Sequence, residues 1–142
     1  MAKTTDPKLG LIASVPLFTG FNRREIEAVG RLMDEIDVKD GRVLMREGAV
    51  GREFFIVVSG TVRIERKGRK VNELGPGDFL GEIALIDRGP RTATAIAAEP
   101  CRLLVLDIGG FRTLVSKYPS VQGKLMKALA ERLREAQPRA VH

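Results

Sequence analysis

Histidine and cysteine are almost missing from this 142-residue chain, and tryptophan is missing altogether. The one histidine is the last residue, His142, and the one cysteine is Cys101. A histidine-based metal site or a Ser-His-Asp triad therefore has no candidate, and no disulfide can form within the chain. A lone cysteine in a strand-like run is typical of a buried, inert side chain. We therefore predict no catalytic residue, no bound metal and no cofactor.

Aromatic residues and long apolar runs are also scarce. One tyrosine and six phenylalanines would make a poor stacking surface for single-stranded nucleic acid. No apolar run approaches the roughly 18 residues that span a bilayer, and the N-terminal MAKTTDPKLG lacks the apolar core of a signal peptide. We expect a cytoplasmic protein without a membrane span, which agrees with the single cysteine. The net charge of +6 permits contact with anions, although a solvated basic surface is the commoner explanation of such a charge.

The pattern of the chain changes twice along its length. Residues 1–34 read as short helices, residues 35–107 as short strands, and residues 108–137 as helices again. The strand-like runs are separated by turn residues; they are IDV, RVLM, EFFIVVS, TVRIER, KVNEL, TATAIAA and CRLLVLD. This spacing predicts an antiparallel jelly-roll-like β-barrel with helices at both ends, rather than alternating β-α units. The length suits one domain that spans residues 1–142.

The expected helices have recognisable ends. Asn22 can cap a helix over residues 23–33, and Pro119 and Pro138 delimit the last helix, over residues 120–137. One face of that helix carries an apolar stripe, made of Val121, Leu125, Leu129 and Leu133. We expect the stripe to pack on its own domain, and a homodimer through this helix is the alternative.

The stretch GEIALIDRGPRTATA, residues 81–95, combines an acid, a base and a tight turn. Gly81 begins a helix-like turn, whose N-terminal N–H groups and partial positive charge attract an anion. Arg91 returns after the turn and can hold two oxygens of one phosphate, while Glu82 can accept from a hydroxyl. A small ligand with a phosphate and a sugar hydroxyl would satisfy both groups. A simple salt bridge between Glu82 and Arg91 explains the pattern equally well.

The stretch resembles the phosphate-binding cassette of cyclic nucleotide-binding domains, the family of catabolite activator proteins and protein kinase A regulatory subunits. The family pattern is Gly-Glu, apolar residues, a variable link and then Arg-Ser/Thr/Ala-Ala-Thr; here GEIAL precedes RTAT. VPLFTGFNRREIEAV, GREFFIVVSGTVRI and GPGDFLGE also match in order and spacing, so the resemblance covers residues 11–137. It implies a cassette helix within the β region and two C-terminal helices.

The resemblance also implies the role of each site residue. Glu82 would accept from the ribose 2′-hydroxyl, and Arg91 would pair with the cyclic phosphate. The other expected ligand contacts are the start of the turn at Gly81, the N–H groups of Ile83 and Ala84, the hydroxyl of Thr92, and the apolar side chains of Ile64 and Val71 beside the base.

Two features leave the choice of base open. In catabolite activators a hydroxyl on the long C-terminal helix caps adenine, but the matching position here is Ala136. Arg134 could stack on the base instead, or it is simply a solvated arginine. Thr92 resembles the residue found in cGMP-selective kinases, although bacterial cAMP receptors also carry Ser or Thr there. We expect cAMP, with cGMP as the rival.

We therefore expect a stand-alone cyclic nucleotide sensor without catalytic activity, which acts on an unknown effector protein. The chain leaves no room for a helix-turn-helix domain, so we expect no direct contact with DNA. The alternative is a protein-interaction module of the same fold that no longer binds nucleotide.

Overall fold

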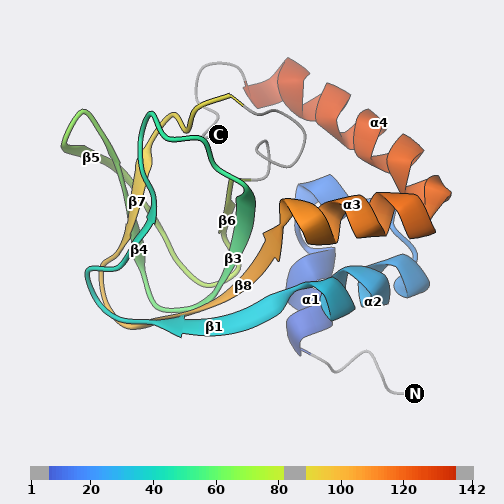
Figure 1. The fold of residues 1–142 in the computed structure, drawn as a ribbon, viewed down its shortest axis with the longest axis horizontal. Coiled ribbons are helices and arrows are strands. Elements are labelled where there is room, and N and C mark those ends of the chain that lie inside the picture. The colour runs from blue at the N-terminus through green and yellow to red at the C-terminus, as the bar shows by residue number, and fades with distance from the viewer. Residues whose placement is uncertain (1–6, 82–88, 137–142) are drawn as a thin grey trace. The chain divides into compact units, whose positions relative to one another are not determined.

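The computed structural model describes residues 7–81 and 89–136, and it divides into a strand-rich unit and a helical unit (Figure 1). Residues 34–108 form the strand-rich unit, and the helices before and after them form the other. These boundaries lie within a residue or two of the changes in sequence pattern. That the two units act as a single domain stays a prediction.

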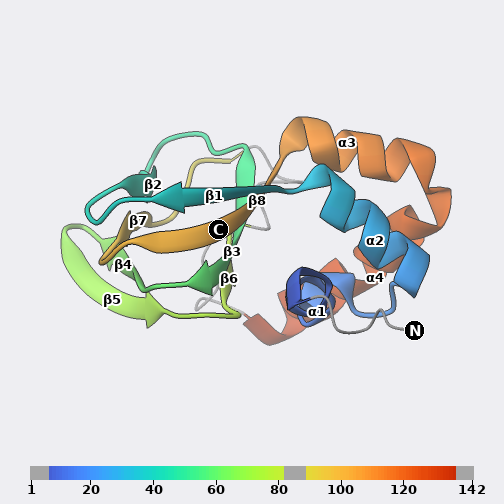
Figure 2. The same ribbon diagram turned by 90° about the horizontal axis from the view of Figure 1, so that it is seen from below.

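The strand-rich unit consists of two four-stranded antiparallel sheets (Figures 1 and 2). The strands are β1 (Asp34–Val38), β2 (Val43–Met45), β3 (Glu53–Ser59), β4 (Val62–Arg66), β5 (Arg69–Leu74), β6 (Phe79–Leu80), β7 (Thr94–Ala97) and β8 (Cys101–Asp107). One sheet has the order β1-β8-β3-β6 and the other β2-β7-β4-β5. The antiparallel jelly-roll-like fold is confirmed, but the predicted barrel is not closed, because no strand pairing among the described residues joins the two sheets.

Each of the seven predicted runs forms a strand, and their alternation places the core. In β4, Val62 and Ile64 are fully buried while Arg63 between them is exposed, as expected for a strand with one inward face. Cys101 is buried as well, as predicted; burial raises the pKa of its thiol, which donates to the carbonyl oxygens of Thr61 and Glu99 at 3.3 and 3.2 Å. The two-residue β6 was not among the predicted strands; it lies directly before the turn expected to begin at Gly81.

The helical unit contains α1 (Pro7–Ala13), the short 3₁₀ helix η2 (Pro16–Phe18), α2 (Arg23–Leu32), α3 (Ile108–Lys117) and α4 (Pro119–Ala136). Asn22 caps α2 as predicted: its side chain accepts from the Glu25 N–H at 2.9 Å, and the Glu25 carboxylate accepts from the Asn22 N–H at 2.8 Å. This reciprocal pair is a capping box. None of the helices in the described part of the chain has both the length and the apolar content needed to cross a membrane.

The start of α4 is joined to α2 through one buried carboxylate. Glu25 is only 2% exposed, and it accepts hydrogen bonds from Ser120 Oγ at 2.5 Å and Lys124 Nζ at 2.6 Å. Burial raises the pKa of the Glu25 carboxyl, but the bonds from Lys124, Ser120 and the Asn22 N–H outweigh it, so the pKa lies below its ordinary value. The carboxylate is therefore charged and fully satisfied, which stabilises the packing of the two helices.

The apolar face of α4 packs within its own unit where the structure describes it. Val121 and Leu125 are buried, as self-packing of the predicted stripe requires. The side chains of Leu129 and Leu133 lie outside the described part. Met126, which projects from a different face, is 65% exposed. The homodimer alternative stays a prediction.

Replacing the buried carboxylate should destabilise the protein. We expect Glu25→Gln to lower the free energy of unfolding by about 2 kcal/mol at pH 7, because it weakens two charge-assisted bonds. Glu27→Gln is the matched control, since Glu27 on the same helix forms only an exposed pair with Arg23 at 3.2 Å; it should change stability by less than about 0.5 kcal/mol. Urea denaturation measures both values.

The pH dependence of that difference follows from the direction of the pKa shift. Because the folded pKa is depressed, the stabilisation is complete above the unfolded pKa of about 4.3 and is lost as the pH falls through the folded value. The difference between wild type and Glu25→Gln should therefore shrink below about pH 4. An equal loss in both variants, or a difference that does not change with pH, would contradict the prediction.

Candidate anion-binding site

A buried arginine stands just before β7 in the strand-rich unit. Arg91 is 4% exposed, and its main chain is held on both sides by the loop between β2 and β3. The Arg91 N–H donates to the Ala49 carbonyl oxygen at 2.8 Å, and the Gly48 N–H donates to the Arg91 carbonyl oxygen at 2.8 Å. The neighbouring Val50 and Pro90 form an isolated antiparallel β-bridge. The backbone of Arg91 is thus held in place by main-chain hydrogen bonds alone.

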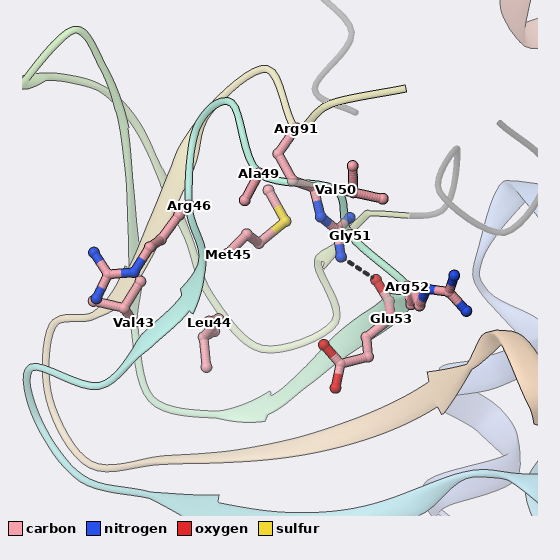
Figure 3. A pocket seen from close by; sticks show the side chains of 10 residues that line it. All are labelled: Val43, Leu44, Met45, Arg46, Ala49, Val50, Gly51, Arg52, Glu53 and Arg91. Atoms are coloured by element: carbon pink, nitrogen blue, oxygen red, sulfur yellow. Dashed lines mark hydrogen bonds between the residues drawn. The ribbon is translucent and has the colours of Figure 1, made fainter. Parts of the chain in front are cut away.

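The guanidinium of Arg91 is only partly satisfied. Nη2 donates to the main-chain oxygen of Glu53 at 2.7 Å (Figure 3), but Nη1 is buried without a hydrogen-bond partner among the residues that the structure describes. Burial lowers the pKa of Arg91, and the nearby charge of Glu53 opposes this shift; an arginine nevertheless stays protonated. A buried cation with an unused donor is costly, and an anionic oxygen next to Nη1 would relieve that cost.

Two glycines leave the space that the guanidinium occupies. A Cβ on Gly51 would lie 1.6 Å from Arg91 Nε, and a Cβ on Gly81 would lie 2.6 Å from Nη1. Gly81 also has φ +85°, a left-handed conformation that glycine adopts readily. The predicted site residues Gly81 and Arg91 are therefore in contact, and Nη1 is the end of the guanidinium next to the start of the expected turn.

A cavity of about 470 Å³ lies beside Arg91. Its lining residues come from β2, the following loop and the start of β3: Val43, Leu44, Met45, Arg46, Ala49, Val50, Gly51, Arg52 and Glu53. In Figure 3 the guanidinium groups of Arg46 and Arg52 point away from Arg91. Of the three arginines that line the cavity, Arg91 is thus the one whose guanidinium is buried inside the strand-rich unit. Over residues 7–81 and 89–136, no group of three His, Cys, Asp or Glu residues could hold a metal ion.

Part of the predicted site lies outside the described residues. Glu82, Ile83, Ala84 and the expected cassette helix all fall in that part, so both the ribose contact and the alternative salt bridge to Arg91 stay predictions. The side chains of Arg134 and Ala136, expected near the base, are also outside the description. Thr92, the residue directly after Arg91, is half-buried.

The two residues predicted beside the base have different environments. Ile64 on β4 is fully buried, whereas Val71 on β5 is 50% exposed. The residue opposite Ile64 is Asn72, and Val71 falls at an irregularity of the β4–β5 register. Neither Ile64 nor Val71 lines the cavity beside Arg91. Their contact with a base stays a prediction.

Sequence reasoning also missed Gly51 and Glu53. Gly51 precedes an apolar strand and reads as an ordinary turn residue, and Glu53 contributes its main-chain oxygen, which no residue type can reveal. The only signal was the match of GREFFIVVSGTVRI to the family, which marked the strand but not its contact with Arg91.

The strand-rich unit is thus a pair of four-stranded antiparallel sheets with an arginine buried beside a cavity. The sequence pattern of the "Cyclic nucleotide-binding domain" family matches residues 35–118, which is more than half of the chain. The chain belongs to this family, and the resemblance drawn from the cassette is confirmed.

Known proteins of several kinds are similar in sequence to this chain. The CRP-like cAMP-activated global transcriptional regulator of Mycobacterium tuberculosis is 30% identical over 87% of this chain and 58% of its own length. The mouse potassium/sodium hyperpolarization-activated cyclic nucleotide-gated channel 2 is 31% identical over 87% of this chain and 14% of its own length. The chain thus spans little more than half of the regulator and a small part of the channel.

Solved structures agree with this assignment. The N-terminal domain of a transcriptional regulator from Streptomyces coelicolor has a TM-score of 0.82 at 30% identity and covers 89% of this chain and 91% of that one. The Thermus thermophilus catabolite activator protein has a TM-score of 0.71 at 35% identity, over 86% and 60%. The cAMP-bound PfPKA-R structure, at 24% identity and a TM-score of 0.66 over 87% and 45%, shares the fold.

The unused donor leads to a prediction for the ligand-free protein. We expect Arg91→Met to raise the free energy of unfolding by about 1 kcal/mol, because an apolar side chain of similar length removes a buried charge that the protein does not fully pair. Urea denaturation without ligand measures the change. A loss of stability of similar size would show that the bond to Glu53 outweighs the cost of burying the charge.

Proposed function

We propose that this chain is a cyclic nucleotide sensor in which Arg91 pairs with the cyclic phosphate. The observation that carries the proposal is the buried Nη1 of Arg91, which has no hydrogen-bond partner within residues 7–81 and 89–136. The guanidinium is already anchored by Nη2 to the Glu53 oxygen, so an arriving phosphate would meet a donor whose position is set. Such preorganisation reduces the entropic cost of binding.

The remaining ligand contacts are proposed from the resemblance. Glu82 accepts a hydrogen bond from the ribose 2′-hydroxyl, and the N–H groups of Ile83 and Ala84 donate to the phosphate. The hydroxyl of Thr92 donates to the phosphate or to the base. Ile64 and Val71 provide apolar surface for the base. We propose cAMP as the ligand, since the regulator from M. tuberculosis is described as cAMP-activated and PfPKA-R was solved with cAMP bound; cGMP is the rival.

We further propose a regulatory role in the cytoplasm, with no catalytic step and no cofactor besides the nucleotide. Ligand binding would change the position of the C-terminal helices relative to the roll, provided that the ligand favours one arrangement. The signal would pass to an effector protein or to a second copy of the chain.

Titration with cAMP and cGMP tests the proposal. A ligand at a hundred times its dissociation constant adds about 2.7 kcal/mol to stability, which should raise the melting temperature by roughly 5–10 °C. Arg91→Ala should abolish most of that shift and most of the heat of binding in calorimetry, because the phosphate loses its buried countercharge. The exposed Arg112→Ala variant on α3 is the control and should bind as wild type does.

The alternative function predicts the opposite result for the melting temperature. A protein-interaction module that no longer binds nucleotide would show no melting shift at saturating cAMP or cGMP. Unchanged binding by Arg91→Ala would instead leave nucleotide binding in place and move the site elsewhere.

A second experiment addresses the ribose contact. Glu82→Ala should weaken cAMP binding less than Arg91→Ala does, because it removes a bond to a hydroxyl rather than the partner of a charge. It should also erase the preference for cAMP over 2′-deoxy-cAMP, which calorimetry with both ligands can measure. A preference that survives the substitution would assign the 2′-hydroxyl to another residue.

A further inference from the structure

We propose that Gly51 is a positioning residue for the anion site: it leaves the space in which the Arg91 guanidinium lies, and thereby directs Nη1 toward the ligand. The proposal rests on the function proposed above. Nothing in the family pattern of the cassette points to this residue, which is 40 positions away from Arg91 in the chain.

The contact covers one whole edge of the guanidinium. A Cβ on Gly51 would lie 1.6 Å from Nε, 2.1 Å from Cζ and 2.4 Å from Nη2 of Arg91. These three distances are far below any real contact, so alanine at position 51 and the present arginine pose exclude each other. The opposite end of the group, Nη1, faces Gly81.

Backbone conformation does not explain the glycine. Gly48 in the same loop has φ +85°, and Gly81 has the same value, so both need glycine whatever surrounds them. Gly51 is not among the residues with positive φ. Alanine could therefore adopt its backbone conformation, and what position 51 requires is space for the guanidinium.

The loop cannot easily move to make room for a methyl group. Two main-chain hydrogen bonds tie Gly48 and Ala49 to Arg91, and Val50 pairs with Pro90. The arginine backbone is held by the same bonds. In Gly51→Ala the side chain of Arg91 is therefore the part that gives way, which breaks the 2.7 Å bond from Nη2 to the Glu53 oxygen and displaces Nη1.

Calorimetry with cAMP gives the first test. Gly51→Ala should weaken binding by about tenfold or more, as expected when a charge-assisted contact loses its geometry. The matched control is Gly75→Ala, because Gly75 is a loop glycine without positive φ and a Cβ there meets nothing within 4 Å. It should bind within about twofold of wild type. Equal affinities for Gly51→Ala and wild type would overturn the proposal.

A double-mutant cycle in the ligand-free protein gives the second test. Gly51→Ala should lower the urea midpoint in the wild-type background and change it little in the Arg91→Ala background, where no guanidinium remains to collide with the new methyl group. The same loss in both backgrounds would mean that Gly51 serves the loop and not Arg91, and the proposal would be wrong.

The two tests also separate this proposal from the function on which it rests. If wild type failed to bind cAMP and cGMP, the proposed function would fall, while the cycle would still decide whether Gly51 positions Arg91.

Discussion

The site depends on the hydrogen bond between the buried guanidinium of Arg91 and the main-chain oxygen of Glu53. That bond, at 2.7 Å, is the side-chain anchor of a cation that the fold has removed from water. It uses one end of the guanidinium and leaves Nη1 without a partner among the described residues. A single acceptor cannot replace the hydration of a whole cation. A negatively charged group beside Nη1 would therefore stabilise the strand-rich unit.

The two buried charged residues of the described chain show how a fold can treat a charge in two ways. Glu25 receives bonds from Asn22, Ser120 and Lys124, so nothing further is needed and the group holds helices together. The Arg91 guanidinium donates to Glu53, and its Nη1 has no acceptor in the described part of the chain. Complete satisfaction is typical of a structural role, and incomplete satisfaction is typical of a ligand site. The contrast supports the assignment of Arg91 independently of the family.

The anchor of Arg91 is also the start of a central strand. Glu53 begins β3 and lies opposite Asp107, the last residue of β8, after which α3 begins at Ile108. The acceptor that anchors Arg91 therefore belongs to the strand pair that ends where α3 begins in the chain.

The sequence by itself determined the features that depend on residues close together in the chain. The Asn22 cap follows from the residue types at positions 22 and 25, and the strands follow from alternation and turn residues, so both were predicted. Arg91 and Gly81 were named as site residues because they stand within one cassette pattern, and the structure places them next to each other. Tertiary structure decided the rest: the open pair of sheets, the two-residue β6, Asn72 opposite Ile64, and the place of Gly51 and Glu53 against Arg91. The contacts of Gly51 and Glu53 with Arg91 join segments about forty residues apart in the chain. They are made by a main-chain oxygen and by the absence of a side chain, and local residue preference reveals neither.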